Sequence, residues 1–134
     1  MNVLTKVSQI MSTDLVTVMA STPLTEAKAL FSKHSIHHLP VVTAEGHLQG
    51  MLSQSDFLKL LETKEASVVG DLMTEGLAKL DLHDSIRTAA SVLSLNRFHA
   101  LPVVDGEKLV GVLTTLDLVK LLDQEQIQLS DYNS

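Results

Sequence analysis

The chain has 134 residues, a formal net charge of −6, no cysteine and only four aromatic side chains. The absence of cysteine excludes disulfides and thiolate metal sites. An acidic chain with two arginines lacks the clustered cations that nucleic acids and anionic membranes require, so neither is an expected partner. Of the residues, 45% are hydrophobic, charges interrupt every apolar run, and the first residues do not resemble a signal peptide. We therefore expect a soluble, cytoplasmic protein with an aliphatic core.

The dominant feature of the sequence is an internal repeat. Val7–Val42 matches Val69–Val104 at 10 of 36 positions, and Gly50–Leu61 matches Gly111–Leu122 at 6 of 12. The difference of one residue between the two copies falls in a turn, where a change of length is tolerated best. Such clustering indicates a duplicated unit of about 60 residues. The predicted division is repeat one at 7–61, a linker at 62–68, repeat two at 69–122 and a polar, acidic tail at 123–134.

In chain order, repeat one is predicted to place two helices around a hairpin. The segment Ser21-Thr22-Pro23 is typical of a helix start, with a hydroxyl cap and proline at the first helical position. Gly46 lies in the turn of the hairpin and can adopt the positive φ that a tight turn needs. The predicted elements are a helical turn at 7–11, a β-like run at 15–18, a helix after Pro23, strands at 38–43 and 48–53, and a helix at 55–61.

Repeat two has the same order of elements. They are a first helix with apolar residues at 86, 89, 90 and 93, strands at 101–104 and 109–113 around the turn Asp105-Gly106, and a second helix at 115–122. Each repeat is therefore βαββα, and the fold class is α/β (α+β). The strand sequences Leu-Pro-Val-Val and Gly-Val-Leu are apolar at consecutive positions, as in strands covered on both faces. Since one repeat is too small for its own core, we expect the two sheets to pack against each other about a pseudo-twofold axis.

The second helix of each repeat has a wider apolar face than one sheet can cover. Its apolar side chains span about 160° of the helix circumference in repeat one and about 220° in repeat two. The excess predicts a partner surface, and a homodimer is the simplest arrangement that covers it. The alternative is that the tail at 123–134 folds back over the same face.

Two motifs occur in both repeats with matched spacing. They are (Ile or Phe)-His-x-Leu-Pro-Val-Val and Gly-x-Leu-(Ser or Thr)-x-x-Asp. Over residues 7–122 the pair of motifs resembles the cystathionine-β-synthase (CBS) domain family, whose tandem pairs are called Bateman modules. The resemblance implies a non-catalytic regulatory module that binds AMP, ADP, ATP or S-adenosylmethionine between its repeats, dimerises, and acts on another protein in trans. Some pairs of this family have no known ligand, so a ligand-free dimerisation or interaction module is the alternative.

The second motif carries the first candidate binding residues. Asp56 and Asp117 lie at strand-to-helix junctions, where a carboxylate can accept both hydroxyls of a ribose, and the resemblance implies this role. Ser53 and Thr114 offer hydroxyls just before a helix N-terminus, which can receive a phosphate. The alternative for all four is helix capping, because (Ser or Thr)-x-x-Asp is also a capping arrangement.

The first motif adds residues near the nucleotide, by resemblance rather than by spacing. His37 and His99 would lie beside the ligand, and Ile36 and Phe98 would give apolar contact to the base unless they are simply part of the core. The positions that would offer backbone groups to adenine are Val16 and Ala78.

This chain departs from the family pattern where phosphate is bound. Family members that bind phosphates often carry Arg or Lys directly after the motif histidine, but those positions here are His38 and Ala100. Lys33, Lys79 and Arg97 are the candidate substitutes. So few arginines argue against a triphosphate and leave AMP, an adenosyl thioether or an empty site open.

Neither an enzyme nor a metal site is predicted. Four histidines, His34, His37, His38 and His47, lie close together in the sequence. His37 and His38 are adjacent at a strand start, so their side chains should point to opposite faces and not converge on one metal ion, and repeat two lacks three of the four histidines. The sequence also has no recognisable pair of nucleophile and base, and no Walker-type phosphate loop. No cofactor is therefore expected beyond a regulatory adenosine ligand.

Overall fold

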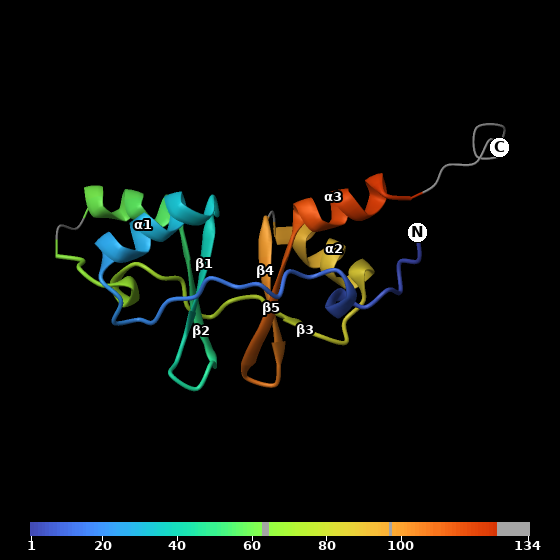
Figure 1. Cartoon of the computed structure of the whole chain (residues 1–134), viewed down its shortest axis with the longest axis horizontal. Helices are drawn as coiled ribbons and strands as arrows, with labels where there is room; N and C mark the ends of the chain where they lie inside the picture. Colours follow the sequence, from blue (N-terminus) through green and yellow to red (C-terminus); the bar gives the residue numbers. More distant parts are fainter. Residues whose placement is uncertain (63–64, 97, 126–134) are drawn as a thin grey trace.

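The computed structural model describes residues 1–62, 65–96 and 98–125, which form two lobes side by side (Figure 1). It confirms the mixed α/β fold. Repeat one contributes α1 (Leu24–His34), β1 (His38–Val42), β2 (Leu48–Ser53) and the 3₁₀ helix η2 (Gln54–Leu61). Repeat two contributes β3 (Leu80–Asp81), α2 (Ile86–Asn96), β4 (Ala100–Asp105), β5 (Lys108–Thr114) and α3 (Thr115–Asp123). Two short 3₁₀ turns, η1 (Val7–Gln9) and η3 (Val69–Asp71), precede the two sets. None of the described helices has the length and apolar character needed to cross a membrane.

Each lobe is built on an antiparallel hairpin in the predicted position. β1 pairs with β2 and β4 with β5, and the register shifts at matched places, after Val41 and after Val103. The turns are closed by Gly46 at φ +85° and Gly106 at φ +64°. The consecutive apolar residues of β1 and β4 are buried, except for the half-buried Val42, as expected for strands covered on both faces.

The prediction of a β-like run at 15–18 is wrong in extent. Only Val18 pairs there, in a single parallel bridge to Val41, so the first sheet has two strands and the second has three. The next N–H group, that of Met19, donates to the Thr22 hydroxyl at 3.0 Å. In repeat two the pairing continues, because the Leu82 N–H donates to the Val104 carbonyl at 3.0 Å.

The predicted hydroxyl cap of α1 is also wrong. Pro23 is the N-cap residue, and no side chain caps the helix. The first free N–H group, that of Leu24, instead donates to the carbonyl of Ser67 in the linker at 3.0 Å. The linker therefore satisfies the backbone group for which a side-chain cap was predicted.

The first turn of each repeat packs in the core of the other repeat. Val7 is fully buried among residues of repeat two such as Leu101, whereas Val69 and Leu72 are buried among residues of repeat one such as Leu39. Figure 1 shows this exchange, with η1 (dark blue) in the lobe of repeat two and η3 (yellow-green) in the lobe of repeat one. Because each lobe is completed by the other repeat, the two lobes are interlocked.

The exchange explains the glycine of the Gly-x-Leu motif. A Cβ atom at Gly50 would lie 2.9 Å from Met73 Sδ, and one at Gly111 would lie 2.8 Å from Met11 Cγ. These two methionines follow η3 and η1 and come from the opposite repeat. The repeated Met and the repeated Gly therefore contact each other across the two repeats, once as Met73 with Gly50 and once as Met11 with Gly111.

Candidate functional site

Two crevices lie between the repeats. Crevice one has a volume of about 170 Å³ and is lined by Ser53 and Asp56 of repeat one. The residues of repeat two that line it include Leu77, Ala78, Phe98 and His99. Crevice two has a volume of about 410 Å³ and is lined by Thr114, Leu116 and Lys120 of repeat two. The residues of repeat one that line it include Leu15, Val16, Ile36 and His37. Each crevice therefore joins the (Ser or Thr)-x-x-Asp end of one repeat to the histidine end of the other.

Nine of the ten candidate residues lie on the wall of one crevice or the other. Asp117 is the exception, since its half-buried side chain is not part of the wall of crevice two. Phe98 is 41% exposed and is thus not a core residue, whereas Ile36 both packs against the core of repeat one and lines crevice two. Contact of these residues with a ligand stays a prediction.

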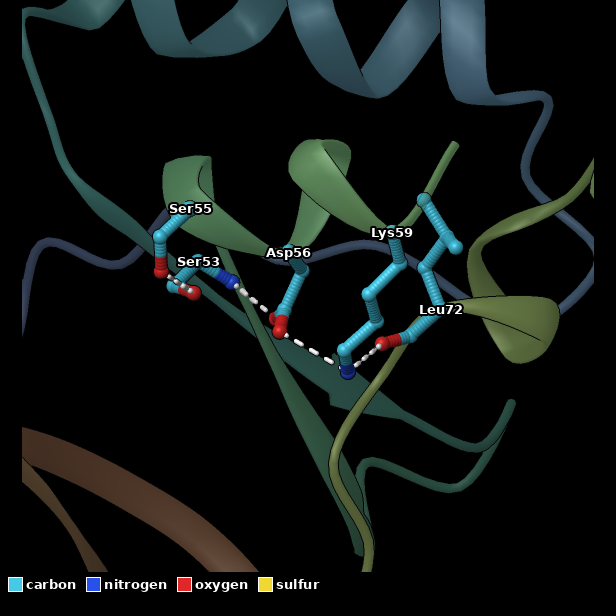
Figure 2. A network of polar contacts seen from close by, with 5 residues as sticks. All are labelled: Ser53, Ser55, Asp56, Lys59 and Leu72. Carbon is cyan, nitrogen blue, oxygen red and sulfur yellow. Dashed lines mark hydrogen bonds and ion pairs between the residues drawn. The ribbon is translucent and has the colours of Figure 1, made fainter. Parts of the chain in front are cut away.

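Asp56 is the centre of a polar network on the wall of crevice one (Figure 2). It is 8% exposed, and its Oδ2 accepts the Ser53 N–H at 2.8 Å, as in a capping box. Its Oδ1 lies 3.0 Å from Lys59 Nζ, which also donates to the Leu72 carbonyl at 3.0 Å. The carboxylate thus caps η2 and is linked through Lys59 to the segment exchanged from repeat two.

Side chains three residues apart are aligned in a 3₁₀ helix, which places Lys59 directly over Asp56. The Ser53 hydroxyl also bonds the Ser55 hydroxyl, at 2.9 Å. Both capping and ligand contact remain open for Asp56, because each carboxylate oxygen can accept more than one hydrogen bond.

The equivalent network in repeat two is smaller. Asp117 Oδ2 accepts the Thr114 N–H at 2.8 Å, and the Thr114 hydroxyl accepts the Asp117 N–H at 3.2 Å. Lys120, which aligns with Lys59, forms no ion pair with any described residue and lies on the wall of crevice two. The two lysines therefore occupy equivalent positions in the sequence but differ in their contacts: Lys59 is paired with Asp56, and Lys120 lines crevice two.

His38 lines both crevices, as does its repeat-two counterpart Ala100. Its pKa is lowered mainly by burial and further by the neighbouring imidazoles of His37 and His99, while Asp56 opposes the shift. His37 is fixed on the other side by Gln54, whose Oε1 lies 2.9 Å from its Nδ1. The side chain that replaces the expected Arg or Lys is therefore a neutral imidazole near pH 7.

The substitute cations named from the sequence are not part of these walls. Lys33 and Lys79 line neither crevice, and Arg97 lies outside the described residues. Lys120 lines crevice two instead, and its only sequence signal is its place in the repeated Lys-Leu-Leu that ends both units. Within the described ranges, no three His, Asp or Glu side chains are grouped closely enough to hold a metal ion.

Comparison with known proteins identifies the family. The family model described as CBS domain matches residues 7–63 and 69–124. The chain belongs to the CBS domain family. CBSX2 in complex with AMP is 32% identical to it, with 90% of this chain and 97% of that chain covered and a TM-score of 0.84. The CBS domain pair of protein MJ0100, in complex with 5′-methylthioadenosine and S-adenosyl-L-methionine, is 27% identical, with 92% and 99% covered and a TM-score of 0.82.

Curated relatives are often much longer proteins. The homoserine O-acetyltransferase of Methanocorpusculum labreanum is 34% identical over 125 residues, which are 87% of this chain but 24% of that protein. Three such relatives are matched over 24–43% of their own length. The shared part is the CBS domain pair.

Proposed function

We propose that this chain is a regulatory module that binds an adenosine-containing ligand between its two CBS repeats and acts on another protein. The observation that carries the proposal is the composition of the crevices. Each contains the hydroxyl end of one repeat and the histidine end of the other, in a chain similar to structures that hold AMP or S-adenosylmethionine. AMP or an adenosyl thioether needs fewer cationic partners than ATP does, and the described residues on the two walls together include a single lysine, Lys120, and no arginine.

The walls supply the chemistry that an adenosine ligand needs. In crevice one, Asp56 would accept ribose hydroxyls, Phe98 would contact the base, and backbone groups at Ala78 would meet the adenine edge. A ligand there touches both repeats at once. It therefore favours whichever arrangement of the two lobes fits it best, and that preference is what a partner protein can detect.

A homodimer is the second part of the proposal. Five large apolar side chains of η2 and α3 are 56–83% exposed: Leu58, Leu61, Leu116, Val119 and Leu122. The two helices lie on the same side of the molecule (Figure 1), so the face extends over both repeats. A second copy of the chain would cover it symmetrically. Residues 126–134 of the tail, the alternative cover, lie outside the described residues.

Calorimetric titration with AMP, S-adenosylmethionine, 5′-methylthioadenosine and adenosine tests ligand binding directly. We expect at least one to bind, and Asp56→Ala to weaken binding while Glu26→Gln, on the exposed surface of α1, leaves it unchanged. At 100 times its dissociation constant a ligand stabilises the fold by about 2.7 kcal/mol, so a thermal-shift assay gives an independent readout. If none of the four binds and the protein is still dimeric by light scattering, the ligand-free interaction module is the correct function.

A further inference from the structure

The two crevices differ in the state of one repeated lysine. Lys59 and Lys120 occupy the same position, three residues after the motif aspartate. Lys59 donates to the Leu72 carbonyl and pairs with Asp56, both at 3.0 Å, and it is not part of the wall of crevice one. The ammonium group of Lys59 is therefore already bound by two groups of the fold.

Lys120 has no comparable ion pair among the described residues. It is exposed, lines crevice two together with Thr114, and pairs with no acidic side chain in the described part of the chain. Nor does it donate to the carbonyl of Ile10, which aligns with Leu72. The second lysine is thus free to bind a ligand that enters crevice two.

The remaining wall residues strengthen the contrast. Of the described residues, no lysine or arginine lines crevice one, and the ionisable side chains on its wall are Asp56, His38 and His99. Crevice two contains Lys120 and the exposed carboxylate of Asp14, beside His37 and His38. A phosphate needs a cationic or hydrogen-bonding partner, and among the residues that the structure describes only crevice two supplies a permanent cation. Crevice two is also larger, at about 410 Å³ against about 170 Å³.

We propose that the crevices have different ligand classes: crevice two takes a phosphate-bearing adenosine ligand through Lys120, and crevice one takes an adenosine ligand without phosphate. The proposal rests on the proposed function, because it assumes that adenosine ligands bind between the repeats. Lys120 is then the residue that determines specificity for phosphate. Lys59, its sequence equivalent, serves to position Asp56.

The test is a comparison of AMP with adenosine on matched variants. Calorimetric titration of wild type, Lys120→Ala, Lys120→Arg and Lys59→Ala gives the affinity of each ligand. We expect Lys120→Ala to weaken AMP about tenfold, which corresponds to about 1.4 kcal/mol, and to change adenosine less than twofold. Lys120→Arg should retain AMP binding, and Lys59→Ala should leave the ratio of the two affinities as in wild type.

The outcomes separate this inference from the function on which it rests. If AMP binds and Lys120→Ala leaves it unchanged, or weakens adenosine by the same factor, the role of Lys120 is refuted while ligand binding stands. If Lys59→Ala lowers the AMP affinity selectively, the assignment of the phosphate to crevice two is refuted. If wild type binds neither ligand, the proposed function fails and this inference fails with it. Urea unfolding of each variant confirms that the mutant proteins are folded.

Discussion

The difference between the two aspartates gives a quantitative prediction about stability. Replacement of Asp117 by alanine removes the acceptor of the Thr114 N–H bond, and the loss of such a cap costs about 1 kcal/mol. Replacement of Asp56 removes the equivalent bond to Ser53 and also the ion pair with Lys59. The lysine side chain is 49% exposed, so we discount that pair to about 0.5–1 kcal/mol. We expect Asp56→Ala to cost about 2 kcal/mol and Asp117→Ala about 1 kcal/mol.

Urea unfolding without ligand measures both values, and Asp117→Ala is the matched control for Asp56→Ala. In thermal unfolding the difference corresponds to roughly 4 °C for each kcal/mol in a chain of this size. A double-mutant cycle with Lys59→Ala should show a coupling of about 0.5–1 kcal/mol between Asp56 and Lys59. Equal costs for the two aspartates, or no coupling in the cycle, would show that the ion pair does not stabilise η2 and that the reasoning is wrong.

Other features of the structure give three further predictions. Gly111→Ala should destabilise the fold by about 1–3 kcal/mol through its clash with Met11, and Met11→Ala should recover part of this loss in urea unfolding. Burial lowers the pKa of His38 below its ordinary 6.5, so the folded chain binds fewer protons than the unfolded chain as the pH falls through that value. Stability should therefore decrease with falling pH below 6.5, and His38→Gln should reduce the slope; an unchanged slope would refute this assignment. Finally, Leu61→Asp combined with Leu122→Asp should convert a dimer into a monomer in light scattering at micromolar concentration, whereas a wild type that is already monomeric would contradict the proposed dimer.

Much of the fold could be predicted because its signals are local. The apolar strand sequences and the turn glycines Gly46 and Gly106 indicate the two hairpins, and the duplicated motifs indicate that the two halves are alike. The exchange of η1 and η3 could not be predicted in this way. A buried valine at position 7 is apolar in either lobe, and only the path of the chain determines whether its neighbours are Leu39 or Leu101. The misplaced cap of α1 has a similar cause, since its replacement is a carbonyl of the distant linker residue Ser67.

The candidate site also depends on contacts between residues that are distant in the sequence. The motifs and the family resemblance give nine residues of the two walls, but they cannot say which residues belong to the same crevice. His38 was identifiable only as a departure from the family pattern, and its position on both walls follows from its place between the repeats. Lys59 bonds a backbone carbonyl of the other repeat and pairs with Asp56, whereas Lys120 forms no ion pair with a described residue, and alignment of the two copies cannot indicate this difference.

The interlocked cores limit how a ligand can act. Separation of the lobes would expose Val7, Val69 and Leu72, all at most 1% accessible, and exposure of each such side chain costs about 1.5–3 kcal/mol. A ligand at 100 times its dissociation constant contributes only about 2.7 kcal/mol, which is less than the total for the three. A bound ligand therefore cannot drive the lobes apart, and its effect must be expressed in smaller movements at the walls that it touches. Ser53 and Thr114 lie on those walls and directly precede η2 and α3, which carry the exposed leucines. The face proposed for the second copy is thus carried by helices that begin at the crevice walls, and a change of dimer affinity on ligand binding is the regulatory output expected from this geometry.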